Sequence, residues 1–271
     1  MRVDIVNFAL RKQNIIGFNF LLSILVIILI VYIIYPFFGL IFVIEPTSLL
    51  ESLKRTEILD SVILSLTTAT ISTILVSIFG IPLAFVLARF QFKAKFLIRM
   101  IVILPLVLPP LASGTMLLGV FGPYSFLGKL IPVDFTQSVI GIIIAQTYVA
   151  SPFLILPAQA AFEAIPERYE IVARTLGKKK WQVFFSISLP LAKIGILIGL
   201  LMAWIRSIGE LGATIMMAYN PHTISIQIFE DSAIGGIRNS VAGIILVIII
   251  ALFALTIFVL LRRHQVLKVG W

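Results

Sequence analysis

The sequence of 271 residues contains no cysteine, only two histidines and few charged residues, 12% in all. The absence of cysteine excludes disulfides, thiolate metal sites and iron–sulfur clusters. His222 and His264 are isolated from each other and from other ligands, so we expect no metal site. By contrast, 60% of the residues are hydrophobic. This balance excludes a single water-soluble domain, which is usually about a quarter charged, and it also excludes intrinsic disorder.

The sequence also lacks the phosphate-binding loop Gly-x-x-x-x-Gly-Lys-Ser/Thr. Gly128-Lys129 and Gly177-Lys178 have neither the upstream glycine nor the following hydroxyl residue. We also find no convergent set of histidines and carboxylates that would indicate a membrane-embedded enzyme, and we predict no catalytic residue. This chain therefore cannot bind ATP through such a loop, and any ATP-driven process in which it takes part needs a separate polypeptide to hydrolyse ATP.

The most prominent feature that is present is a series of long apolar stretches. A helix needs roughly 20 apolar residues to cross a bilayer, whereas β-barrel strands are shorter and alternate. The sequence therefore predicts an all-α integral membrane protein with a first helix at 18–44 and a transmembrane domain over 58–262. The five spans expected in that domain are about 61–88, 98–121, 138–161, 194–218 and 240–261.

Lysine and arginine are distributed unequally between the predicted loops. Sixteen lie on one side of the membrane and four on the other, with Arg206 inside the fifth span. By the positive-inside rule the basic side is cytoplasmic. This places both termini, as a segment 1–17 and a tail 262–271, in the cytoplasm. It also explains the net charge of +9 without nucleic acid as a partner.

The longest predicted cytoplasmic connection is the segment 163–190, which we call the polar hairpin. Pro166 favours a helix start, and Gly177 indicates a helix end. A second amphipathic piece follows, and we expect it to end at Pro190. Such a hairpin either lies on anionic lipid headgroups or forms a docking surface for a cytoplasmic partner, and its residues alone leave both interpretations open.

The polar hairpin resembles the motif of permease subunits of ATP-binding-cassette importers, which reads Glu-Ala-Ala, three residues, Gly, nine residues, Ile-x-Leu-Pro. Gly177 is followed after nine residues by Ile187-Ser-Leu189-Pro190, and Ala173 falls on the second alanine. The motif's glutamate is replaced by Ile171, with Glu170 one residue earlier. The resemblance implies a coupling helix that fits a cleft on an ATPase subunit. The residues implied in coupling are Glu167, Glu170, Ile171, Ala173, Arg174, Leu176 and Gly177.

Two further segments are similar to oxyanion permeases of this family. Residues 104–110, Leu-Pro-Leu-Val-Leu-Pro-Pro, are similar to molybdate-type permeases. Residues 209–214, Gly-Glu-Leu-Gly-Ala-Thr, are similar to molybdate, tungstate and sulfate permeases. The resemblance implies a type I importer permease for molybdate or tungstate, with sulfate or another solute as the alternative.

The same resemblance implies the assembly in which the chain works. The partners are two copies of a cytoplasmic ATPase, a second copy of this chain, an extracytoplasmic oxyanion-binding protein and the lipid bilayer of the cell membrane. ATP and Mg would be bound by the ATPase, and no cofactor by this chain.

The fifth predicted span contains a charged pair, Arg206 and Glu210, four residues apart. A charge at membrane depth is costly unless it is paired or hydrated. The pair therefore either fixes helix packing as an ion pair or lines a translocation path or gate together with Ser207 and Thr214. For a path we predict a passage and not a tight binding site, because tight binding would slow release.

Overall fold

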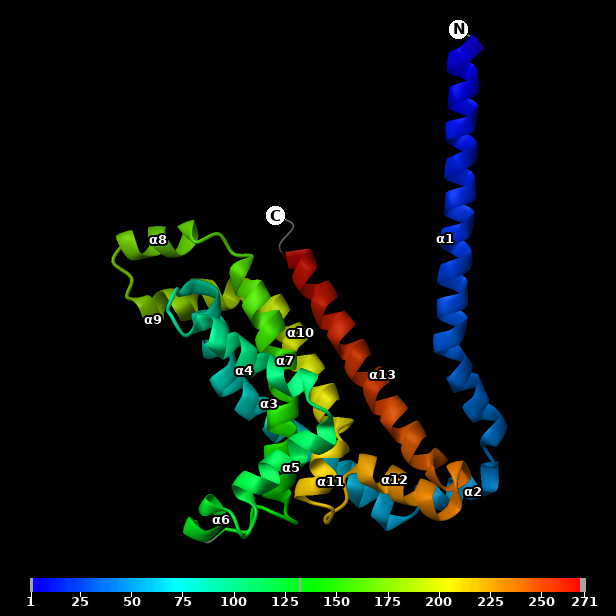
Figure 1. The fold of residues 1–271 in the computed structure, drawn as a ribbon, viewed down its shortest axis with the longest axis vertical. Helices are drawn as coiled ribbons and strands as arrows, with labels where there is room; N and C mark the ends of the chain where they lie inside the picture. The colour runs from blue at the N-terminus through cyan, green and yellow to red at the C-terminus, as the bar shows by residue number, and fades with distance from the viewer. Residues whose placement is uncertain (1, 132, 269–271) are drawn as a thin grey trace. The chain divides into compact units, whose positions relative to one another are not determined.

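The computed structural model describes residues 2–131 and 133–268, and the side chains of residues 1–18, 46–48, 50 and 261–271 lie outside the described part (Figure 1). The predicted segment 1–17 and tail 262–271 are therefore described by backbone alone, and Met1 and 269–271 not at all. The described residues are mostly helical and contain no strand. This confirms the all-α prediction. The chain divides into two units, Met1–Leu50 and Glu51–Trp271.

The first unit consists of α1 (Arg2–Val43) and the beginning of α2 (Pro46–Leu53). Its candidate membrane span is Asn19–Val43. Large apolar side chains from Phe20 to Phe42 are exposed around the helix. A helix that is apolar all round is either buried in a large core or embedded in a membrane, so α1 has the surface of a lipid-facing span.

The second unit contributes five further candidate spans, so the described part of the chain holds six. This confirms the predicted number. At the centre of the unit, α3 (Thr56–Arg89), α7 (Val139–Glu163) and α10 (Leu189–Ile208) pack against one another. Small residues permit this close approach: a Cβ added to Gly199 would lie 2.9 Å from the carbonyl oxygen of Leu154. The other helices are α4 (Lys95–Val107), α5 (Pro110–Phe121), α6 (Phe126–Leu130), α8 (Arg168–Thr175), α9 (Lys180–Val183), α11 (Gly212–Met217), α12 (Ile224–Gly235) and α13 (Ile237–Lys268).

The third span differs from the single helix expected at 98–121. It is divided into α4 and α5 by extended backbone at Leu108 and Pro109, with ψ of 135° and 137°. Proline lacks a backbone N–H and disfavours helix in the residue before it, so two adjacent prolines interrupt the helix. Pro110 then occupies the first turn of α5, where the missing N–H costs nothing. The candidate span in this region is Pro110–Leu130.

The fifth span also differs from its expected range, 194–218. Pro190 does not end a helix but lies in the first turn of α10. A π-helical turn, Phe184–Ser188, precedes it, and the N–H of Leu189 donates to the oxygen of Phe184. The wider turn makes room for the proline ring, so one candidate span runs over Lys180–Ile208. After α10 the chain bends at Gly209, and residues 212–217 form the separate helix α11.

Candidate functional site

The polar hairpin folds as α8, a glycine turn and α9, at one end of the helix bundle (Figure 1). Gly177 has φ of +87°, as its predicted role at the helix end requires. The N–H of Lys178 donates to the oxygen of Ala173, and the N–H of Gly177 donates to the oxygen of Arg174. These two bonds form a Schellman motif, which satisfies carbonyls at the end of α8.

Glu170 fixes α8 to the membrane helices from inside the bundle. Its Oε1 accepts a hydrogen bond from Arg89 Nε at 2.8 Å and another from Ser188 Oγ at 3.0 Å. The side chains of Arg89 and Glu170 are only 7% and 10% exposed. Arg89 also donates to the oxygen of Ile165 at 2.9 Å. One buried carboxylate therefore joins α8 to the end of α3 and to the π-helical turn.

An aromatic cluster lies beside this ion pair. The ring of Phe85 in α3 packs edge-on against Phe162 in α7 and Phe184 in the π-helical turn, with centroids 5.3 and 4.9 Å apart. Such pairs add to the stabilisation from burial. The π-helical turn at the end of the polar hairpin is therefore packed against α3 and α7 through aromatic side chains.

The residues predicted for coupling divide into two groups. Glu170 and Ala173 are buried against the bundle. Glu167, Ile171, Arg174, Leu176 and Gly177 are exposed. Ile171 is 49% exposed and Leu176 is 80% exposed, beside Val172 at 56%. One side of α8 thus holds the polar hairpin in place, and the other side presents apolar side chains between charged ones, as a docking surface does.

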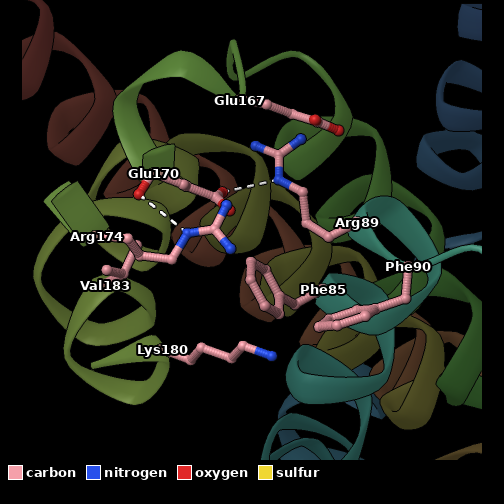
Figure 2. Close-up of a pocket in the computed structure, with 8 residues that line it drawn as sticks. All are labelled: Phe85, Arg89, Phe90, Glu167, Glu170, Arg174, Lys180 and Val183. Atoms are coloured by element: carbon pink, nitrogen blue, oxygen red, sulfur yellow. Dashed lines mark hydrogen bonds and ion pairs between the residues drawn. The ribbon is translucent and has the colours of Figure 1, made fainter. Parts of the chain in front are cut away.

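A cavity of about 130 Å³ lies between the polar hairpin and the end of α3. Figure 2 shows the guanidinium groups of Arg89 and Arg174 close to the Glu170 side chain, with Phe85 and Phe90 below Arg89 in this view. Arg174 Nε is 3.4 Å from the backbone oxygen of Glu170. The sequence analysis missed Arg89 and Ser188, because nothing in the spacing of the chain relates them to Glu170.

The second predicted site lies at the end of α10. Arg206 and Glu210 form an ion pair there, and Glu210 Oε1 accepts a hydrogen bond from the N–H of Ala213 at 2.7 Å. The Glu210 side chain is 1% exposed and that of Arg206 is 25% exposed. Ser207 and Thr214 are buried as well. Of the four predicted path residues, only Arg206 reaches the surface of this single chain, and their role in transport stays a prediction.

The opposite end of the bundle carries a polar cluster formed by residues on and before α12 together with Arg55, which precedes α3. His222 Nδ1 lies 2.9 Å from Glu230 Oε2, and Arg55 Nη2 lies 3.3 Å from Asp231 Oδ1. Burial and the neighbouring Glu230 carboxylate raise the pKa of the Tyr219 hydroxyl. These contacts fix α12 to the bundle by its polar as well as its apolar side chains.

Residues 80–269 match the family described as binding-protein-dependent transport system inner membrane component. The chain belongs to this family. It is therefore a multi-pass membrane permease of a transport system that works with a binding protein, and the polar hairpin lies inside the matched region.

Curated relatives cover most of the chain. A probable molybdenum ABC transporter permease protein of Haloferax volcanii is 42% identical over 202 residues, which is 74% of this chain and 75% of that protein. A molybdate/tungstate transport system permease protein of Thermococcus kodakarensis is 38% identical over 218 residues, covering 79% and 81%. A molybdenum transport system permease protein of Mycobacterium bovis is 32% identical over 202 residues, covering 72% and 76%.

Solved structures share the fold. The crystal structure of a bacterial alginate ABC transporter, in complex with an alginate pentasaccharide-bound periplasmic protein, contains a chain with a TM-score of 0.71 and 18% identity. The match covers 95% of this chain and 96% of that one. The MetNI methionine ABC transporter in an inward-facing conformation gives a TM-score of 0.62 at 17% identity, with 76% and 95% covered. At these identities the likeness establishes the fold of an importer permease and not the cargo.

Proposed function

We propose that this chain is the permease subunit of an ATP-driven importer for molybdate or tungstate. The observation that supports this cargo is that the relatives reported above are named as molybdenum or molybdate/tungstate permeases. They are 32% to 42% identical to this chain over most of its length. The Gly-Glu-Leu-Gly-Ala-Thr segment at 209–214 is consistent with an oxyanion permease. Sulfate or another solute, the alternative from the sequence, is not favoured by these relatives.

The structure supports a coupling role for the polar hairpin. Its α8 is fixed through Glu170 to the end of α3 and to the π-helical turn before α10, and it presents exposed Ile171, Val172 and Leu176 on the outside. Exposed apolar side chains next to charged ones favour a protein partner over water. We infer that this partner is an ATPase subunit, which binds ATP and Mg, and that this chain itself holds no cofactor and performs no hydrolysis.

The assembly follows from the single polar hairpin in each chain. If the ATPase works as a pair, two copies of the permease are needed, and a closed two-fold arrangement is the usual outcome. We propose a homodimer of this chain with two ATPase subunits and one oxyanion-binding protein on the extracytoplasmic side. Both termini and the polar hairpin then lie in the cytoplasm, on the basic side of the membrane.

Vesicle uptake tests the cargo directly. The purified permease–ATPase complex is reconstituted into vesicles, and ATP-dependent uptake of labelled molybdate is measured with the binding protein present. We expect an excess of unlabelled tungstate to suppress the uptake of labelled molybdate. The same concentration of unlabelled sulfate should leave that uptake nearly unchanged. Suppression by sulfate at least as strong as that by tungstate would contradict the proposed cargo.

A further inference from the structure

A second cavity, separate from the one beneath the polar hairpin, lies where α3 ends and α4 begins. Its volume is about 540 Å³, and its walls include Phe92, Lys93, Lys95, Phe96, Arg99 and Glu163. Figure 1 shows that this turn lies at the same end of the bundle as α8 and α9. The cavity is therefore at the boundary where span α3 leaves the membrane.

The cations of this cavity outnumber its anions. Glu163 Oε1 already accepts hydrogen bonds from Arg99 Nη2 at 2.8 Å and from Gln159 Nε2 at 2.7 Å. Among the described side chains no carboxylate pairs with Lys93 or Lys95. Arg99 Nε is buried and donates to no acceptor in the described part of the chain. Two unpaired lysines thus line the cavity together with Arg99, whose Nε–H is unused.

Nothing in the start of α4 offsets this positive charge. The first turn of α4 has no acidic residue, and Ala94 before it has no side chain that accepts from the helix. The partial positive charge of a helix start therefore adds to that of Lys95 and Arg99. The combination favours an anion with several oxygens.

Apolar surface continues from the cations along α4. Phe96 is 71% exposed, and Leu97, Met100 and Ile101 after it are exposed too. A small hydrated anion would use the cations and leave this surface bare. A lipid uses both, because its phosphate meets the basic groups while its chains lie against the apolar side chains.

We propose that this cavity binds the phosphate headgroup of an anionic membrane lipid, with the lipid chains along the exposed face of α4. Apart from Glu163, the first residue of the polar hairpin, the site involves neither that hairpin nor Arg206, and it does not depend on the identity of the transported oxyanion. The bound lipid would hold the α3–α4 turn at the membrane surface while the other segments at this end of the bundle, such as α8 and α9, move.

Spin-labelled lipids test the proposal in the full permease–ATPase complex. The complex is placed in phosphatidylcholine vesicles, and the preference of labelled phosphatidylglycerol over labelled phosphatidylcholine for the protein is measured by electron paramagnetic resonance. The double variant Lys93→Gln, Lys95→Gln removes both lysines. We expect its preference for phosphatidylglycerol over phosphatidylcholine to fall by about fivefold for each lysine removed. Lys93→Arg, Lys95→Arg should retain it, which excludes a general loss of folding as the cause.

A matched control removes two charges elsewhere on the same side of the membrane. Lys179 and Lys193 are exposed and do not line the cavity, so Lys179→Gln, Lys193→Gln should keep the preference. The proposed site would be wrong if both glutamine variants lost the lipid preference equally. It would also be wrong if Lys93→Gln, Lys95→Gln kept that preference. A free oxyanion is tested by adding molybdate or inorganic phosphate to complexes without phosphatidylglycerol. Binding that depends on Lys93 and Lys95, with no lipid preference, would also overturn the lipid assignment.

Discussion

At the scale of single residues, Glu170 and Glu210 are both buried but have different surroundings. Glu170 is enclosed by Arg89 and Ser188 and joins segments far apart in the sequence. Glu210 pairs with Arg206 four residues earlier and accepts from the Ala213 N–H. The first carboxylate fixes tertiary structure, whereas the second fixes a local bend next to the predicted path. The same substitution therefore has different consequences at the two positions.

Glu170→Gln is expected to destabilise the complex and to uncouple it. Removing one partner of a buried ion pair leaves an unpaired charge, here Arg89, at a cost of about 3–5 kcal/mol. We expect a lower melting temperature and a lower ratio of oxyanion transported to ATP hydrolysed. Glu167→Gln is the matched control for the melting temperature, since Glu167 is exposed and lies just before the same helix. Equal melting temperatures for the two variants would show that the Arg89–Glu170 pair does not anchor α8.

Arg206→Gln is expected to reduce ATP-driven uptake while the permease still assembles with its ATPase. The single variant also leaves Glu210 buried without its cation, so stability has to be separated from transport. In the double variant Arg206→Gln, Glu210→Gln the amide oxygen can still accept from the Ala213 N–H, and the lost stability should return. If Arg206 serves the passage of an anion, uptake stays low in the double variant. Recovery of uptake along with stability would assign the pair a purely structural role.

At the scale of elements, the polar hairpin depends on one backbone conformation. Gly177 has φ of +87°, and a Cβ added there would meet nothing within 4 Å. The cost of a substitution is therefore conformational and not steric. Gly177→Ala should cost about 1–2 kcal/mol, since left-handed backbone is unfavourable for residues with a Cβ. Gly177→Asn should cost less, because asparagine tolerates this region.

Hydrogen exchange at the end of α8 measures this difference. The N–H groups of Gly177 and Lys178 are bonded to α8 carbonyls. We expect faster exchange there in Gly177→Ala than in Gly177→Asn, with α7 unchanged in both. Identical exchange in the two variants would mean that the left-handed turn is not required.

The helical spans and the glycine turn could be predicted because their signals are local: apolar length, and a glycine that follows an amphipathic stripe. A proline alone does not show where a span divides, because Pro82, Pro152 and Pro157 remain inside long helices. The division of the third span at Pro109 could therefore not be predicted from the sequence. The continuation through Pro190 needed the π-helical turn before it. The contact of Arg89 with Glu170 joins residues 81 apart and appears only with the fold.

At the scale of the whole molecule, the predicted topology makes the two ends of the bundle chemically distinct. α8 and α9 lie at one end and α6 at the other (Figure 1). The native chain has no cysteine, so a single introduced thiol gives labelling without background. This property makes orientation straightforward to measure.

Labelling by a membrane-impermeant maleimide in intact cells should separate these ends. Lys179→Cys, beside the glycine turn, is expected to react only after the membrane is opened. Tyr124→Cys, at a residue 90% exposed near α6, is expected to react from outside. The reverse pattern would invert the topology and place the polar hairpin out of reach of any ATPase.

The central claim is that the exposed face of α8 is the surface by which a separate ATPase drives these helices, and co-purification tests it most directly. Ile171→Ser, Val172→Ser, Leu176→Ser removes the apolar surface and keeps Glu170, Ala173 and Gly177 intact. Phe229→Ser, Ile234→Ser removes exposed apolar surface from α12, at the other end of the bundle. The account predicts that ATPase recovery with the tagged permease falls severalfold in the first variant and stays at the native level in the second. Full recovery with the first variant, together with undiminished ATP-driven uptake, would contradict it.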